Sequence, residues 1–253
     1  MKLTFLGTGT SQGIPVIGCS CEICTSSDPR NKRLRTSMLV ETADKTVVID
    51  SGPDFRYQML RAGVKDLDAI VFTHEHKDHI AGLDDIRPFN YLLKKNIDIY
   101  ADHRVEHALR REFSYIFSDV TYPGLPQINL HEISGMPFQI GETTFIPIEV
   151  MHYKLPIFGF RIHDFTYITD AKTISDAAVE KIKGSKILVV NALQVSEHIS
   201  HFTLEEAVEF AERVNAEMTY LTHISHNLGL HQEVEKALPA HIRLAYDGLT
   251  LTL

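Results

Sequence analysis

Short apolar runs bounded by turn-forming residues alternate with amphipathic stretches along most of the chain. The runs are rich in Val, Ile, Phe and Thr, a composition typical of β-strands. They predict strands over residues 3–6, 38–41, 47–49, 69–72, 97–100, 143–148, 158–162, 165–168, 186–190, 218–221 and 250–253. Helical periodicity predicts helices over residues 55–62, 104–117, 175–183 and 203–214, and the last opens with the capping-box pair Thr203 and Glu206.

The order of these elements favours an α/β fold built from two packed sheets. Strands come in consecutive groups in each half of the chain, and each group is followed by helices, which does not fit a regular parallel βαβ array. No internal repeat, low-complexity tract or linker-like stretch interrupts the sequence. We therefore expect one domain over residues 1–253, with mixed β-sheets inside and helices on the outer faces.

Composition and charge limit the kinds of molecule that the chain is expected to bind. The 253 residues are 44% hydrophobic and 23% charged, which is enough apolar content for a sizeable core. The 25 Lys and Arg against 33 Asp and Glu give a net charge of −8, which disfavours binding to bulk nucleic acid. Without a long apolar run or a cleavable leader, the chain is expected to be cytoplasmic, with no membrane partner.

Four potential metal ligands follow the predicted strand 69–72 within six residues: His74, His76, Asp78 and His79. A turn after a strand frees side chains from the alternation that would divide them between the two faces of a sheet. Imidazole and carboxylate together suit zinc, manganese or iron better than calcium. The plainer alternative is a solvated polar loop.

Three cysteines, Cys19, Cys21 and Cys24, lie close together near the start of the chain. An odd number at this tight spacing does not suit a disulfide framework, whereas thiolate ligands suit a reducing compartment. Three thiolates favour tetrahedral zinc and require a fourth ligand from elsewhere. Buried thiols or a redox switch are the alternatives.

The His-x-His-x-Asp-His run over residues 74–79 resembles the signature of the metallo-β-lactamase superfamily. The other positions of the family pattern are filled in order, by Asp50, His152, Asp170 and His223, each after a predicted strand. The resemblance implies the αβ/βα sandwich of that family. It also explains the Gly-rich stretch at residues 7–13 as a tight turn beside the active site, since that stretch does not fit the spacing of a dinucleotide-binding loop.

The same resemblance implies a site for two catalytic divalent metals, zinc or manganese, with iron as an alternative. One metal would be held by His74, His76 and His152, and the other by Asp78, His79 and His223. Asp170 would bridge the two metals, and Asp50 would orient the histidine loop from behind. Two metals at such a site can share a hydroxide that attacks phosphorus, which is hydrolase chemistry.

The cysteine cluster narrows the resemblance to the PhnP-like phosphodiesterase branch. That branch implies a structural zinc held by the three cysteines and His226, in a small insertion over about residues 18–36. His201, in the run His-Phe-Thr-Leu-Glu-Glu, resembles the residue that protonates the leaving oxygen there. His226 could instead contact a substrate phosphate. His201 could instead be a surface residue, and His198, three residues earlier, could be mistaken for it.

The function implied is therefore a binuclear metal-dependent phosphodiesterase acting on small phosphodiesters, cyclic ones foremost. Asp78, Asp170 and His201 are its expected catalytic residues. An accessory protein similar to pyrroloquinoline-quinone biosynthesis protein B and a nuclease similar to ribonuclease Z are the alternatives. A homodimer is an alternative to a monomer. The remaining histidines match no motif and are expected at the surface or partly buried: His103, His107, His131, His163, His231 and His241.

Overall fold

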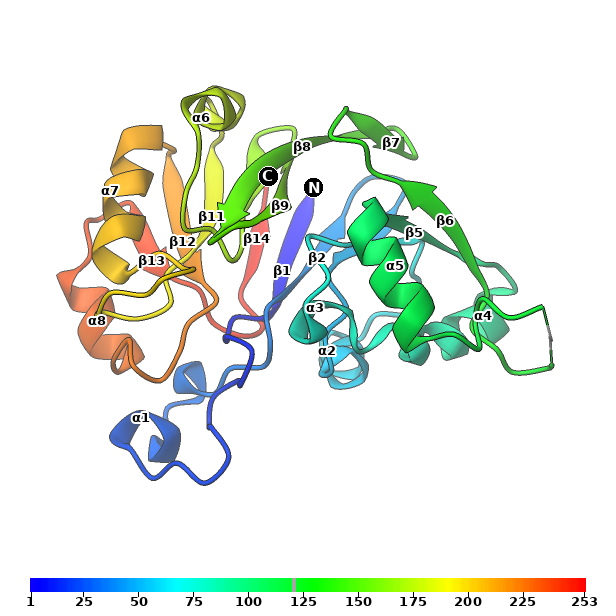
Figure 1. Cartoon of the computed structure of the whole chain (residues 1–253). Helices are drawn as coiled ribbons and strands as arrows, with labels where there is room; N and C mark the ends of the chain where they lie inside the picture. Colours follow the sequence, from blue (N-terminus) through cyan, green and yellow to red (C-terminus); the bar gives the residue numbers. More distant parts are fainter. Residues whose placement is uncertain (120–121) are drawn as a thin grey trace.

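Two seven-stranded sheets face each other in the computed structural model, which describes residues 1–119 and 122–253 (Figure 1). The first sheet has the order β14-β1-β2-β3-β4-β5-β6, and the second has the order β13-β12-β11-β10-β9-β8-β7. Each sheet is mixed, because antiparallel hairpins at one side give way to parallel strands at the other. This is the predicted fold class.

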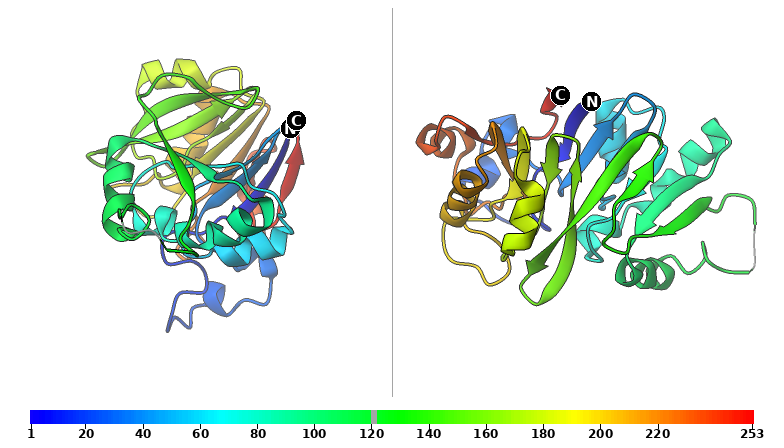
Figure 2. Two further views of the ribbon diagram at one scale, coloured as in Figure 1. Left: turned by 90° about the vertical axis from the view of Figure 1, so that its right-hand side faces the viewer. Right: turned by 90° about the horizontal axis from the view of Figure 1, so that it is seen from above.

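The strands of the first sheet are β1 (Lys2–Gly7), β2 (Ser37–Glu41), β3 (Thr46–Ile49), β4 (Ala69–Val71), β5 (Ile97–Ala101), β6 (Ile128–Glu132) and β14 (Thr250–Thr252). Those of the second sheet are β7 (Phe138–Ile140), β8 (Thr143–His152), β9 (Leu155–Ile162), β10 (Phe165–Tyr167), β11 (Ile187–Asn191), β12 (Met218–Thr222) and β13 (Ile242–Leu244). β14 pairs with β1, so the two chain ends lie side by side, as both views in Figure 2 show.

The helices are α1 (Glu22–Thr25), α2 (Phe55–Ala62), α3 (Lys77–Ile80), α4 (Arg87–Leu93), α5 (His103–Glu112), α6 (Asp176–Ile182), α7 (Leu204–Val214) and α8 (His231–Ala237). Two single turns of 3-10 helix, η1 (Pro29–Asn31) and η2 (Leu83–Ile86), complete the described elements. Among the described residues, no helix combines the length and apolar content needed to cross a membrane.

Alternation along the strands separates three layers of apolar side chains. In β2, Met38 and Val40 point between the sheets, whereas Leu39 faces the layer beneath α2, α4 and α5. In β11, Val189 points between the sheets and Leu188 faces the layer beneath α6 and α7. Because successive strand residues point to opposite faces, each sheet contributes to an inner core and to an outer one.

The predicted elements are present, with shifts at their ends and some omissions. The helix predicted over 104–117 ends at Glu112, and the chain continues in turns. β6, β7 and β13 were not predicted, nor were α1, α3, α4 and α8. The omitted strands are short, and β6 and β7 lie at sheet ends where half of their side chains reach solvent, so their apolar pattern is weak.

Candidate metal centre

Strand ends bring the predicted site residues to one edge of the sandwich. Asp50 follows β3, Asp170 follows the short β10, and His223 follows β12. All three have a left-handed backbone, with φ of 63°, 58° and 56° respectively. Non-glycine residues rarely adopt this conformation, and such strain concentrates at functional sites, where the surrounding structure maintains it.

One group of donor atoms is formed by His74, His76 and His152, and these atoms lie within 4.8 Å of one another. His74 Nε2 is 3.1 Å from His76 Nδ1, both in the loop between β4 and α3. His152 ends β8 and comes from the opposite sheet. Burial and the nearby ring of His79 keep the pKa of His74 well below its ordinary value, so His74 is neutral, as a metal ligand must be.

A second group is formed by Asp78, His79 and His223, also within 4.8 Å. His79 Nε2 is buried, makes no hydrogen bond to any described residue, and lies 3.2 Å from Asp78 Oδ2. Asp170 adjoins both groups, because a carboxylate oxygen lies within 4.8 Å of donor atoms of His74 and of His152 in the first group. In the second group, its Oδ2 is 3.4 Å from His79 Nε2 and 3.1 Å from His223 Nδ1. An orphaned imidazole nitrogen surrounded by carboxylates fits a divalent cation.

A layer of hydrogen bonds fixes the orientation of these rings. Asp50 Oδ2 lies 2.7 Å from His79 Nδ1, and its carboxylate also accepts the backbone N–H and hydroxyl of Thr73, both at 2.8 Å. His152 Nδ1 lies 2.9 Å from the carbonyl oxygen of Ser200. When Nδ1 donates its proton in this way, Nε2 presents a lone pair to the site.

His201 packs against the same groups and is 8% exposed, so it is not the surface residue of the plainer alternative. Its ring is stacked on His223 and lies beside His152, and its Nδ1 is buried 3.7 Å from Asp170 Oδ1. Burial lowers the pKa of His201 to about 3, although Asp170 acts in the opposite direction. Burial thus favours the neutral ring, and an anion bound beside it would favour the protonated one.

The three cysteines and His226 form a separate cluster beside the first. Their sulfur atoms lie 3.4, 3.4 and 3.6 Å from His226 Nδ1 for Cys19, Cys21 and Cys24 respectively. In a tetrahedral zinc site, bonds of about 2.3 Å to sulfur and 2.0 Å to nitrogen separate these two ligand atoms by about 3.5 Å. The donor set and its spacing therefore fit zinc.

Sequence reasoning did not find the interactions of the Gly-rich loop. Gly9 pairs with both Arg35 and Ile224, so the loop lies between the end of the cysteine-bearing segment and the loop that carries His223. Thr10 Oγ1 is 3.2 Å from His223 Nε2. A hydroxyl after a Gly-rich turn has no sequence signature, because its partner lies more than two hundred residues away.

The expectation for His231 was wrong. This side chain is 2% exposed, and its Nδ1 lies 3.0 Å from the guanidinium of buried Arg33, which also donates to Thr8 Oγ1 at 2.8 Å. Asn31 accepts the His231 backbone N–H. His231 therefore fastens the cysteine-bearing segment, whose helix α1 projects from the body in Figure 1, to the start of α8.

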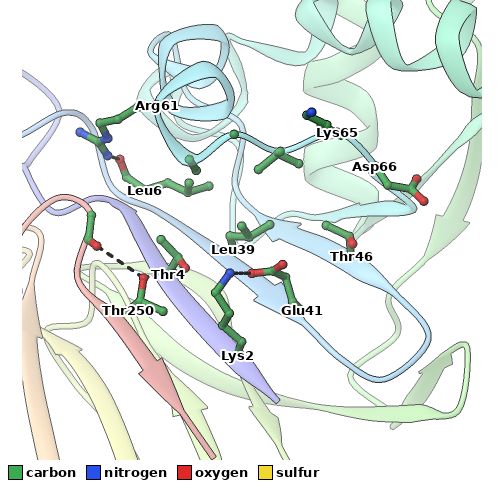
Figure 3. A pocket seen from close by; sticks show the side chains of 14 residues that line it. Lys2, Thr4, Leu6, Leu39, Glu41, Thr46, Arg61, Lys65, Asp66 and Thr250 are labelled. Carbon is green, nitrogen blue, oxygen red and sulfur yellow. Dashed lines mark hydrogen bonds and ion pairs between the residues drawn. The ribbon is translucent and has the colours of Figure 1, made fainter.

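Two hollows help to locate the open side of the centre. One, of about 520 Å³, is lined by Asp78 together with Arg35, Lys77, Val16 and Ile17. The other, of about 500 Å³, lies between the sheet face of β1 and β2 and the end of α2 (Figure 3). It contains none of the predicted site residues, and Lys2 in it is already paired with Glu41 at 2.6 Å. Of these two hollows, only the one beside Asp78 borders the centre.

Comparison with known proteins agrees with this geometry. Residues 45–224 match the model of the beta-lactamase superfamily domain. An octanoyltransferase of Porphyromonas gingivalis is 41% identical over 252 residues, which cover 98% of this chain and 51% of that protein. The chain thus spans about half the length of that relative. A ribonuclease Z of Mycobacterium sp. is 24% identical over 299 residues, covering 98% and 94% respectively.

Among solved structures, a diphosphatase from the PhnP family has a TM-score of 0.93 and 43% sequence identity, covering 100% of this chain and 97% of its own. Zinc-bound PqqB from Methylobacterium extorquens has a TM-score of 0.84 at 16% identity, covering 100% of both chains. The second likeness concerns the fold alone.

Proposed function

The chain belongs to the metallo-β-lactamase superfamily of metal-dependent hydrolases. On that premise, we propose that it hydrolyses small substrates at a phosphorus atom on which two of the four oxygens are bonded to a further group. Cyclic and linear phosphodiesters and disubstituted diphosphates share this centre. The observation that supports the proposal most is the pair of three-donor groups that Asp170 adjoins, with buried His201 beside them. The similar diphosphatase of the PhnP family supports the same class of bond.

In this proposal, His74, His76 and His152 would hold one divalent metal, and Asp78, His79 and His223 would hold the other. Asp170 would be a ligand common to both sites, and Asp50 would keep His79 in place. The metals, zinc or manganese with iron as an alternative, would supply an activated water and neutralise charge on the phosphoryl oxygens. Cys19, Cys21, Cys24 and His226 would hold a structural zinc, and three cysteines outside any disulfide suit a reducing compartment such as the cytoplasm.

His201 is the proposed proton donor. Its Nδ1 lies 3.7 Å from Asp170 Oδ1, and His201 forms a further three-donor group with His152 and Asp170. A phosphate anion bound there opposes the effect of burial and favours the protonated ring. The ring can then give its proton to a departing alkoxide, which is a poor leaving group without one.

Elemental analysis and a substrate screen on metal-reconstituted protein test the proposal. We expect about three metals per chain, two of them required for turnover. The protein should hydrolyse bis(p-nitrophenyl) phosphate, a small cyclic phosphodiester or a disubstituted diphosphate. At most one metal per chain, or no turnover of any of these substrates by the loaded protein, would overturn the proposal.

Two further observations distinguish the alternative functions. A precursor transfer RNA tests the ribonuclease Z alternative, which the relative from Mycobacterium sp. favours and the net charge of −8 opposes. The accessory-protein alternative predicts a loaded but inert protein. The acyl transfer named for the octanoyltransferase is not proposed for this chain, because that protein is about twice as long.

A further inference from the structure

The hollow beside Asp78 combines a cationic side chain with an apolar wall. Arg35 and Lys77 line it, together with Ser11 and Gln12, and Val16, Ile17, Pro53 and Ala81 form its apolar part. Its volume of about 520 Å³ is in the range of pockets that enclose a small organic ligand. Because Asp78 belongs to both the hollow and the metal centre, a substrate bound at the metals can extend into this space.

Arg35 has hydrogen-bonding capacity that the protein leaves unused. Its guanidinium is ion-paired with Asp54, whose Oδ2 lies 3.0 Å from Nε and accepts the Arg35 backbone N–H at 2.8 Å. Nε itself is buried and makes no hydrogen bond within the described part of the chain, and neither do Nη1 and Nη2. Asp54 therefore keeps the guanidinium in place by charge, while its nitrogens remain available to an anion.

Backbone packing fixes the position of Arg35 relative to the metal centre. A Cβ atom on Gly52 would lie 2.0 Å from the carbonyl oxygen of Asp78 and 3.7 Å from Arg35 Cβ, so Gly52 lies against both residues. A Cβ atom on Gly13 would lie 3.5 Å from Arg35 Nη1, so the Gly-rich loop covers the guanidinium. The same loop contacts His223 through Thr10. Gly52 thus lies between Arg35 and Asp78, which belongs to the second donor group.

Ile17 provides an independent observation. Its side chain is fully exposed at the rim of the hollow, although a side chain of this size is ordinarily buried. Val16 and Pro53 extend the same apolar surface. The other cation of the hollow, Lys77, is paired with Glu112 and is more exposed than Arg35, so solvent screens its charge more strongly.

We propose that this hollow binds the second half of a disubstituted diphosphate, with Arg35 holding the phosphate that is not attacked and Ile17 covering the apolar or aromatic group attached to it. This inference rests on the proposed function and names the substrate class within it. In the reaction, a water oxygen bonds to the phosphorus at the metal centre and the bond from that phosphorus to the bridging oxygen breaks. The electron pair stays on the bridging oxygen, giving two phosphate monoesters and two protons to solvent.

The test compares two substrates on metal-loaded protein. Diadenosine diphosphate contains the second phosphate, and thymidine 5′-(p-nitrophenyl) phosphate lacks it. The phosphate that is not attacked is bound in the substrate and gains charge as the bridging oxygen departs, so loss of a contact to it should raise KM and also lower kcat for the diphosphate. Arg35→Ala should raise KM for the diphosphate by about 10–100-fold and change KM for the single phosphate by less than about 3-fold.

Three further variants make the result specific. Arg35→Lys should recover part of the loss, since it restores charge without the two-pronged geometry. Arg56→Ala, an exposed arginine in a separate groove beside α2, should change neither KM. Ile17→Ala, which removes an exposed side chain and leaves folding intact, should raise KM for the diphosphate by about 3–10-fold.

The outcomes separate the inference from the proposed function. An equal KM change on both substrates, an unchanged KM in both Arg35→Ala and Ile17→Ala, or a wild type that turns over only the single phosphate would overturn the inference alone. A loaded wild type inert on both substrates would overturn the proposed function and the inference with it. Should Arg35→Ala fail to fold, Arg35→Lys and Ile17→Ala decide the question by the same KM comparison.

Discussion

The molecule carries two clusters of side chains that suit a metal, and they differ in whether the protein supplies every ligand that an ion needs, as in a closed cluster, or not, as in an open one. The cysteine cluster offers four donor groups at the spacing of a tetrahedral ion, and none of its four side chains lines the hollow beside Asp78. The histidine and aspartate cluster offers more donor groups than one ion requires, divides them into two groups and opens onto that hollow. A saturated site can stabilise a fold, whereas only an unsaturated one can accept water and substrate.

The two clusters are nevertheless connected by one short loop. His223 belongs to the open cluster and His226 to the closed one, three residues further on. The Gly-rich loop lies against this segment, through the backbone pairing of Thr10 with Ile224 at 3.0 Å. A change in one cluster that propagates to the other would do so here, so variants can measure how independent the two clusters are.

The largest expected effect comes from the carboxylate shared by both donor groups. Asp170→Ala should lower kcat by more than about 10³-fold, because loss of a partner that merely orients a ligand already costs about 10–100-fold. Elemental analysis should show weaker binding of both catalytic metals and an intact cysteine-bound zinc. A variant that kept both metals and its turnover would remove Asp170 from the shared position.

His201→Ala should have the next largest effect, and one that depends on the substrate. A positioned proton donor contributes about 10²–10⁴-fold, so kcat on an alkyl or cyclic phosphodiester should fall by that factor with metal content unchanged. The loss should be smaller for a p-nitrophenyl diester or a diphosphate, whose leaving groups depart without a proton. An equal loss on all substrates would instead indicate stabilisation of a phosphoryl oxygen.

Asp50→Ala tests the layer behind the open cluster. Its carboxylate is fully buried and orients His79 through Nδ1, so its removal should lower turnover by about 10–100-fold. The affinity for the second catalytic metal should fall with it, as metal titration of the apo protein would show. Asp50→Asn, which retains one acceptor oxygen, is the matched variant and should lose less.

The comparison of the clusters also shows what the sequence could predict. The histidine loop and the cysteines were found from their close spacing, and Asp170 was found from the resemblance to the metallo-β-lactamase pattern; the structure gathers the cysteines in one cluster and the histidine loop and Asp170 in the other. The two-sheet architecture followed from the grouping of the strands. Buried His231 was missed because only its contact with Arg33, 198 residues away in the chain, explains its burial. Arg35 was missed for the same reason, since Gly52 and Gly13 position it from elsewhere in the chain.

The smallest effect on turnover should come from the closed cluster, where the effect on stability is large instead. Cys21→Ser should release the structural zinc and lower Tm by about 10 °C, because metal bound only in the folded state contributes to folding. His226→Ala should behave like Cys21→Ser, with kcat below its transition within about threefold of wild type. Differential scanning calorimetry with elemental analysis measures both variants.

His223→Ala is the matched control on the same loop, and its result should be the reverse. It removes a donor of the open cluster, so turnover should collapse while the cysteine-bound zinc remains. If His226→Ala lost turnover but kept its zinc and its Tm, His226 would belong to substrate binding and the closed cluster would need another fourth ligand. If both variants lost zinc and turnover together, the loop would couple the two clusters, because backbone pairing with Thr10 would then transmit the loss from one to the other.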